Sequence, residues 1–283
     1  MIKIGFQACS VTEAFLNDPL GTIDAIAGFG YRYMETAGTM FTDRLTTPLR
    51  DIRAKMESAG IEHVAKHFNF VSMEHVEQEI SLLNAIGGKY VVLASDYFAS
   101  KDELLAQCEL YNEAGRRCAA EGKRFVYHNH AHEFQDFGGK PALQLILENT
   151  DPEWVDFEVD VMWAYWGGYD PADVLKTFGS RVKMLHLGDF HPKYRSRRSF
   201  FDGLDPNVAI TREFYSRYNI DVAADIGEGT MDLQSIFDAA DRYASVEYGF
   251  VELSGENSLF KHNLLEGAEF NFRALKKYVG LEL

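Results

Sequence analysis

One local pattern recurs along most of this sequence: a short β-branched or aromatic run, then a turn, then a segment with helical spacing. This alternation is typical of β–α units that build a parallel sheet. The runs that we expect to form strands lie at residues 2–8, 31–36, 61–67, 90–94, 125–129, 155–160, 182–187 and 248–253. The neighbouring segments that we expect to be helical lie at 18–30, 47–60, 73–87, 101–122, 141–149, 171–178, 233–243 and 262–279.

An open, doubly wound sheet would show the same alternation. The number of units and the first turn therefore distinguish an open sheet from a closed barrel. The first expected strand is followed by Gln7-Ala8-Cys9-Ser10 and not by a glycine-rich nucleotide-binding turn. Eight units favour a closed (β/α)8 barrel, and a barrel of this kind commonly uses about 250 residues. We therefore expect the 283 residues to form a single α/β barrel domain, residues 1–283.

Composition excludes several partners. The chain has 28 basic and 43 acidic side chains, and its net charge of −15 argues against binding to nucleic acid or anionic lipid. The cysteines are too few and too irregularly spaced for a disulfide framework or a zinc knuckle. No apolar run reaches the roughly 18 residues of a membrane span, and the N-terminus does not resemble a secretory signal. These features predict a cytoplasmic protein without a membrane partner.

The longest departure from the repeat lies between residues 190 and 229, where an extra helix is expected near 209–218. Long insertions after late barrel strands often serve the active site, although a solvated loop is the alternative. This segment carries Arg195, Arg197 and Arg198 in an otherwise acidic chain. Such a cluster is suited to hold an anionic group of a substrate or of a neighbouring subunit.

Polar residues gather at the carboxyl ends of the late strands, where barrel enzymes place their sites. The sequence YHNHAHEF ends the fifth strand with His128, His130 and Glu133, and the next strands end at Asp160 and at His186, with Asp189 just beyond. The last strand ends at Glu252. Each residue alone has an ordinary structural explanation, such as a helix cap. Together, carboxylates and imidazoles that converge at one end of a barrel predict a divalent-metal site.

These motifs identify a resemblance. The stretches YHNHAHEF, EVDVMWA, MLHLGDF and GEGTMD, with the final FVEL strand, resemble the xylose-isomerase-like TIM barrel superfamily, which includes sugar phosphate isomerases and epimerases. The resemblance spans the chain and is sharpest from residue 125 to 255. It implies one divalent metal, Mn²⁺ first and Co²⁺, Mg²⁺, Fe²⁺ or Zn²⁺ as alternatives. It also implies a homo-oligomer or a heteromeric partner.

The family pattern of a Glu, an Asp, a His and a second Glu maps the last three metal ligands onto Asp160, His186 and Glu252. Glu133 is our choice for the first ligand and His130 is the second choice, because the fifth strand carries histidines where many members place the glutamate. Gly188 departs from a lysine that many relatives carry, so substrate handling is expected to differ from theirs.

A metal held beside a carbonyl and a hydroxyl of a sugar-like substrate would stabilise the enediolate formed by proton abstraction. That intermediate leads to a sugar isomerase or epimerase, or, by β-elimination, to a dehydratase or lyase acting on an inosose or keto-glycoside. The residues expected to transfer protons are Glu133, Glu252, His128 and His130. A phosphodiesterase like the AP-endonuclease branch and a non-catalytic sugar-binding barrel are the remaining alternatives.

Further residues are expected to contact a small sugar or keto-sugar substrate. They lie at strand ends or in the GEGTMD turn and are Lys66, His67, Trp163, Asp189 and Glu228. Aromatic walls for a sugar ring are expected from Phe6, Phe68, Trp163, Trp166 and Phe190, although aromatic residues at strand ends often belong to the core.

Overall fold

Eight parallel strands close into a barrel in the computed structural model, which describes residues 1–69, 72–197, 199–206, 208–253 and 257–283. Each strand pairs with the next along the chain, and pairing of the first strand with the last closes the ring. A short strand, β11 (Leu281–Glu282), adds to β1 outside the ring. The barrel strands are β1 (Ile2–Gln7), β2 (Tyr33–Ala37), β3 (Glu62–Phe68), β4 (Tyr90–Leu93), β5 (Arg124–His128), β6 (Val155–Asp160), β7 (Val182–Leu187) and β10 (Tyr248–Val251).

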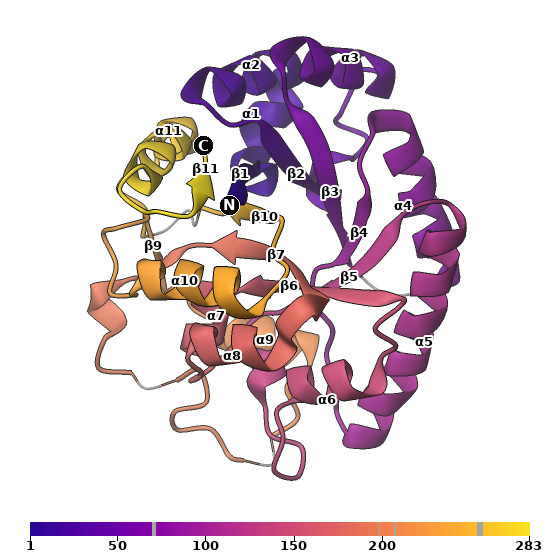
Figure 1. The fold of residues 1–283 in the computed structure, drawn as a ribbon, viewed down its shortest axis with the longest axis vertical. Coiled ribbons are helices and arrows are strands. Elements are labelled where there is room, and N and C mark those ends of the chain that lie inside the picture. Colours follow the sequence, from indigo (N-terminus) through magenta and orange to yellow (C-terminus); the bar gives the residue numbers. More distant parts are fainter. Residues whose placement is uncertain (70–71, 198, 207, 254–256) are drawn as a thin grey trace.

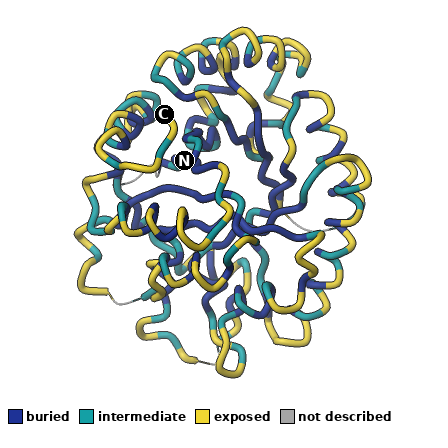
Figure 2. Tube along the Cα trace, viewed as in Figure 1, coloured by how far each residue is buried: buried dark blue, intermediate teal, exposed yellow. Residues whose placement is uncertain are grey.

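The barrel predicted from the sequence is therefore confirmed, and each predicted strand lies within two residues of the observed bounds. The reason is that parallel strands covered by helices are buried on both faces and read as nearly continuous apolar runs. Every residue of β4, for example, is buried. Figure 2 shows the same contrast, with buried trace along the strands and exposed trace on the outer sides of the helices.

Helices surround the strands (Figure 1). Those that follow barrel strands are α2 (Pro19–Phe29), α3 (Leu49–Ala59), α4 (Met73–Ile86), α5 (Lys101–Ala120), α6 (Ala142–Asn149), α8 (Pro171–Phe178), α10 (Leu233–Tyr243) and α11 (Leu264–Leu275). Gly60 ends α3 in the left-handed conformation, at φ 71° and ψ 29°, which glycine adopts without steric cost. The part of the chain that the structure describes contains no helix long and apolar enough to cross a membrane.

Two short helices were not predicted, α1 (Thr12–Asn17) and α7 (Val161–Trp166). The sequence of α7, VMWAYW, is too short and too apolar to show a helical period, so no helix could be predicted from it. Asp160 separates the two elements, because its carboxylate accepts a hydrogen bond from the Trp163 amide and caps α7.

The insertion after β7 is folded. It contains the antiparallel pair β8 (Asp189–Phe190) and β9 (Ala223–Ala224), and the helix α9 (Arg212–Tyr218), which matches the one expected near 209–218. A second apolar core joins this segment to α7, with Met162, Trp166, Phe190, Phe200, Ile210, Tyr215 and Val222 among its buried members. The insertion is thus held over the carboxyl ends of the late strands and is not a solvated loop.

Candidate active site

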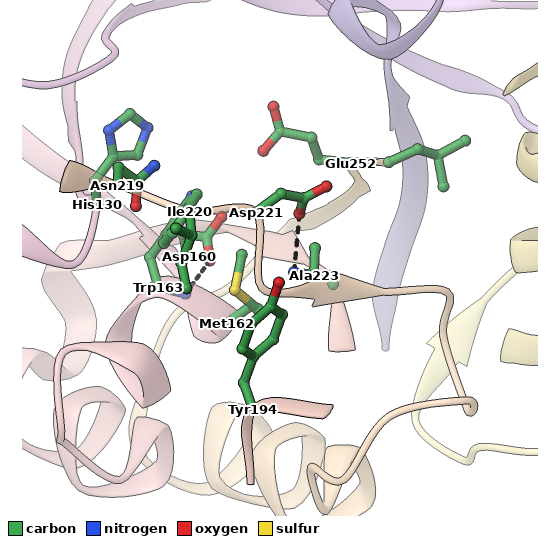
Figure 3. A pocket seen from close by; sticks show the side chains of 12 residues that line it. His130, Asp160, Met162, Trp163, Tyr194, Asn219, Ile220, Asp221, Ala223 and Glu252 are labelled. Atoms are coloured by element: carbon green, nitrogen blue, oxygen red, sulfur yellow. Dashed lines mark hydrogen bonds between the residues drawn. The ribbon is translucent and has the colours of Figure 1, made fainter. Parts of the chain in front are cut away.

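A pocket of about 540 Å³ opens at the carboxyl ends of the late strands (Figure 3). Strand ends and α7 form one side of it, and the insertion forms the other. The lining residues from the barrel and α7 are His130, Asp160, Met162, Trp163, Gly188, Glu252 and Leu253. Those from the insertion are Tyr194, Asn219, Ile220, Asp221 and Ala223.

Three of the four predicted metal ligands meet beside this pocket, and two of them, Asp160 and Glu252, line it. Asp160 and His186 lie opposite each other in the register of β6 and β7, and Glu252 directly follows β10. His186 Nδ1 is 3.3 Å from Glu252 Oε2 and 3.8 Å from Asp160 Oδ2. We call Asp160, His186 and Glu252 the outer group, and one donor atom from each lies within 4.8 Å of the others.

Below the outer group, a second set of polar side chains fills the centre of the barrel. His67 Nε2 lies 2.7 Å from Glu158 Oε2, and His128 Nδ1 lies 3.2 Å from the same oxygen. His186 Nε2 lies 2.6 Å from Glu35 Oε2, and Gln7 donates a hydrogen bond to that oxygen. We call Glu35, His67, His128, Glu158 and His186 the inner cluster. All of its members are buried, and His186 belongs to both sets.

Charges within the inner cluster compensate one another. Burial alone would lower the pKa of His67, but the Glu35 and Glu158 carboxylates raise it to about 9. The same carboxylates, acting against burial, hold the pKa of His186 well above its ordinary value. Burial and the neighbouring charged His186 lower the pKa of His128 to about 4. The Glu35 and Glu158 carboxylates thus favour the protonated forms of His67 and His186, while His128 stays neutral, so opposite charges offset one another within the cluster.

The outer group adds two further carboxylates around His186, whose ring already faces Glu35 and Glu158 of the inner cluster. Burial is the main cause that raises the pKa of Asp160 to about 8, and the nearby Glu252 carboxylate raises it further. Burial also acts to raise the pKa of Glu252, but hydrogen bonding and charge from His186 keep it below its ordinary value. Two carboxylates and one imidazole beside an open pocket form a donor set that suits a divalent cation. The inner cluster also offers one imidazole nitrogen or carboxylate oxygen from each of His67, His128, Glu158 and His186 within 4.8 Å.

Glu133, the expected first ligand, is not part of either set. It lies in a short 3-10 helix after β5, where its carboxylate accepts hydrogen bonds from the His130 amide (2.9 Å) and the Tyr127 hydroxyl (3.1 Å). Burial raises its pKa to about 8. The physical reason for this placement is the turn that follows β5, which directs the side chain toward the loop's own N–H groups.

The other expected site residues lie in the pocket, in the inner cluster or away from both. His130 and Trp163 line the pocket, and His67 and His128 lie in the inner cluster. Three others lie elsewhere. Lys66 is buried and pairs with Glu79 on α4, Asp189 accepts hydrogen bonds from the amides of Gly227, Gly229 and Met231, and Glu228 is exposed.

Of the expected aromatic walls, Trp163 lines the pocket, whereas Phe6, Phe68, Trp166 and Phe190 are buried in the apolar cores. Arg195 and Arg197 line a separate cavity of about 590 Å³ beside Tyr165 and Asp170, and Arg198 lies outside the described residues. Arg195 and Arg197 therefore do not line the pocket beside the outer group.

Several site residues were missed from the sequence. Glu35 lies on β2 opposite Gln7 of β1, and its role depends on barrel closure, which no local pattern reports. Glu158 had a signal, because it precedes Asp160 by two residues and must share its face of β6. Cys9 was considered only for a disulfide framework or a zinc knuckle, yet its thiol donates a hydrogen bond to the Glu252 carboxylate at 3.2 Å. Asn219 and Asp221 lie in the insertion, where spacing carries no information about contacts.

Comparisons with known proteins agree with this architecture. An inosose dehydratase of Geobacillus kaustophilus is 26% identical over 164 residues, which cover 49% of this chain and 53% of that protein. The matched region thus covers about half the length of this relative. A crystal structure of a sugar phosphate isomerase/epimerase from Parabacteroides distasonis superposes with a TM-score of 0.75 and 23% identity, covering 99% of both chains.

A further solved structure, of the IOLI protein with a binding zinc atom, superposes with a TM-score of 0.71 and 15% identity over 99% of this chain and 100% of that one. At these identities the solved structures establish the fold alone. The family model described as xylose isomerase-like TIM barrel matches residues 23–264. The eight-stranded barrel and this match over most of the chain show that the protein belongs to the xylose isomerase-like TIM barrel family.

Proposed function

We propose that this protein is a divalent-metal-dependent enzyme that moves a proton beside the carbonyl of a sugar or keto-sugar, as an isomerase or epimerase. The observation that carries the proposal is the outer group, in which Asp160, His186 and Glu252 meet at the edge of a pocket of about 540 Å³. A pocket of this volume is suited to a small-molecule ligand.

We assign the metal to the outer group and not to the inner cluster. The side chain of Glu252 is 33% exposed, whereas every side chain of the inner cluster is 8% exposed or less. A catalytic ion needs open positions for substrate oxygens, and only the outer group adjoins the pocket. A bound divalent ion would polarise a substrate carbonyl and stabilise negative charge on neighbouring oxygens. Mn²⁺ remains our expectation, with Co²⁺, Mg²⁺, Fe²⁺ or Zn²⁺ as alternatives.

His130 is the residue that we assign to proton transfer. Its side chain lines the pocket, and its buried Nδ1 has no hydrogen-bond partner among the residues that the structure describes. Burial lowers its pKa, which favours the neutral ring. The neutral imidazole is the form that acts as a general base. The Trp163 ring lies 5.4 Å from the His130 ring between centroids, and it restricts where a substrate carbon can lie relative to His130 Nδ1.

Elimination of water from an inosose is the second candidate. Sequence relatives support it, because the curated proteins that this chain resembles are inosose dehydratases, at 22–26% identity. Both candidates begin with the same proton abstraction. They differ in whether the substrate carries a leaving group at the next carbon.

Solvent deuterium exchange separates the two candidates. The Mn²⁺-loaded protein would be incubated in deuterated buffer with D-fructose or with an inosose, and the products followed by NMR. Incorporation of deuterium without loss of water identifies an isomerase or epimerase, and formation of an unsaturated product identifies a dehydratase. Absence of both, in protein that has been shown to bind the metal, would reject the proposal.

A further inference from the structure

The insertion supplies one complete side of the pocket, and that side is chemically distinct from the outer group. Asn219 and Asp221 follow α9 directly, and Tyr194 lies earlier in the same segment. Asp221 is already occupied, because its carboxylate accepts a hydrogen bond from the Ala223 amide at 3.1 Å. Asn219 is therefore the insertion's available amide at the pocket.

Asn219 carries a polar atom that has no partner in the described part of the chain. Its side-chain Oδ1 is buried and accepts no hydrogen bond from any described residue, and the same is true of His130 Nδ1. Figure 3 shows these two side chains at the same end of the pocket. A buried acceptor without a partner is costly, so two of them in one pocket indicate a polar ligand group that completes both.

Packing holds Asn219 beside His130. The backbone N–H of Asn219 donates a hydrogen bond to the backbone carbonyl of Tyr215 at 2.8 Å, which fixes the end of α9. The Tyr215 ring lies parallel to the His130 ring, with 5.8 Å between centroids and 7° between planes. Tyr215 is itself buried in the core that joins the insertion to α7. Asn219 is thus placed by a folded element and not by a free loop.

The charge of the pocket limits the ligand further. Among the described residues that line it there is no lysine or arginine, whereas Asp160, Asp221 and Glu252 contribute carboxylates. A divalent ion would offset two of these three charges when all are ionised. Arg195 and Arg197 line the other cavity and do not line this pocket. A phosphate group would therefore meet no cationic side chain among the described lining residues, and the bound ion would be its positive partner there.

We propose that Asn219 is a specificity-determining residue that accepts a hydrogen bond from a hydroxyl of an unphosphorylated, polyhydroxylated substrate, and so positions that substrate beside His130. A hydroxyl can donate to Asn219 Oδ1 and still interact with the imidazole, which suits the two unpartnered atoms. The inference rests on the proposed function of the outer group. It adds that the insertion selects neutral sugars or keto-sugars over their phosphate esters.

Ligand-observed NMR titrations of the Mn²⁺-loaded protein test this proposal, with D-fructose and an inosose as neutral probes and D-fructose 6-phosphate as the charged probe. We expect at least one neutral probe to bind about 10-fold more tightly than the phosphate ester, and Asn219→Leu to weaken it about 10-fold through loss of the acceptor. Asn219→Asp keeps an acceptor oxygen and should bind the neutral probe nearly as the parent protein does.

Ser216→Ala is the matched control, because Ser216 is an exposed residue of α9 whose hydroxyl donates to the Glu213 carbonyl one turn earlier. This substitution should leave the affinity for the neutral and the charged probes unchanged. Equal or tighter binding of D-fructose 6-phosphate, or an Asn219→Leu variant that binds the neutral probe as tightly as the parent, would overturn the inference alone. Failure of the parent protein to bind Mn²⁺ or any of the sugars would instead reject the proposed function, and this inference with it.

Discussion

The inner cluster and the outer group share His186 but differ in access and in charge. Inner carboxylates are paired with histidines at 2.6–3.4 Å in a region closed to solvent. The outer carboxylates have one imidazole between them and adjoin a pocket. The difference shows that ligand-type residues alone do not define a metal site. Where neighbouring side chains already neutralise one another, a cation gains less than where charge is left uncompensated.

His186 also links the two sets mechanically. Its Nδ1 faces the outer carboxylates, while its Nε2 meets Glu35. Metal-binding histidines commonly donate their second N–H to a carboxylate, which fixes the ring orientation. The inner cluster would then serve as the support of the outer group, and variants of each set should have separable effects.

The largest effect is expected from His186→Ala, which removes the residue common to both sets. Metal affinity should fall by more than the roughly 10- to 100-fold that is typical when only a hydrogen-bond partner of a metal ligand is mutated. Stability should fall by about 3–5 kcal/mol, since the buried Glu35 carboxylate loses an ionic partner. Elemental analysis after dialysis and urea denaturation measure these changes. Stoichiometric metal in this variant would contradict the assignment of His186.

Asp160→Asn and Glu158→Gln separate the two sets on one strand. The two carboxylates lie two residues apart on β6, so the substitutions form a matched pair. Asp160→Asn should lose the metal with little loss of stability. Glu158→Gln should retain metal but lose about 3 kcal/mol of stability, because it breaks buried ion pairs. The opposite pattern, measured by the same two methods, would place the ion in the inner cluster.

Glu35→Gln tests the support role directly. The amide keeps the shape of the side chain but replaces the carboxylate that meets His186 Nε2 at 2.6 Å. Metal affinity is expected to fall about 10- to 100-fold, measured by competition with a chelator. An affinity equal to that of the parent protein would show that the inner cluster does not support the ligand.

The smallest effect is expected from Glu133→Gln, because Glu133 belongs to neither set. Metal content should be unchanged. The folded-state pKa of about 8 lies above the unfolded value near 4.5, so unfolding releases a proton between these limits. The parent protein should therefore lose stability relative to the variant as pH rises from 5 to 8, by up to about 1.4 kcal/mol per unit. Urea denaturation at several pH values tests this, and loss of metal from the variant would restore Glu133 as a ligand.

Local pattern accounts for most of the fold and for part of the candidate site. The strand endings at Asp160, His186 and Glu252 could be located from sequence because parallel strands of a barrel bring their carboxyl ends together. Lys66 could not be placed in this way. Its neighbour His67 points into the barrel while Lys66 points toward α4, and the direction of each depends on which face of β3 is inside.

The sequence by itself determined the order and approximate length of the eight barrel strands and of the longer helices that follow them, because apolar periodicity and helix-ending glycines are local properties. Only the tertiary structure decided which polar side chains meet. Closure of the ring and the register between strands bring Glu35 to His186 across 151 positions of sequence, and the turn after β5 keeps Glu133 away from the outer group. Packing of the insertion onto α7 places Asn219 at the pocket. Such contacts between distant segments depend on packing in three dimensions, which a one-dimensional pattern does not contain.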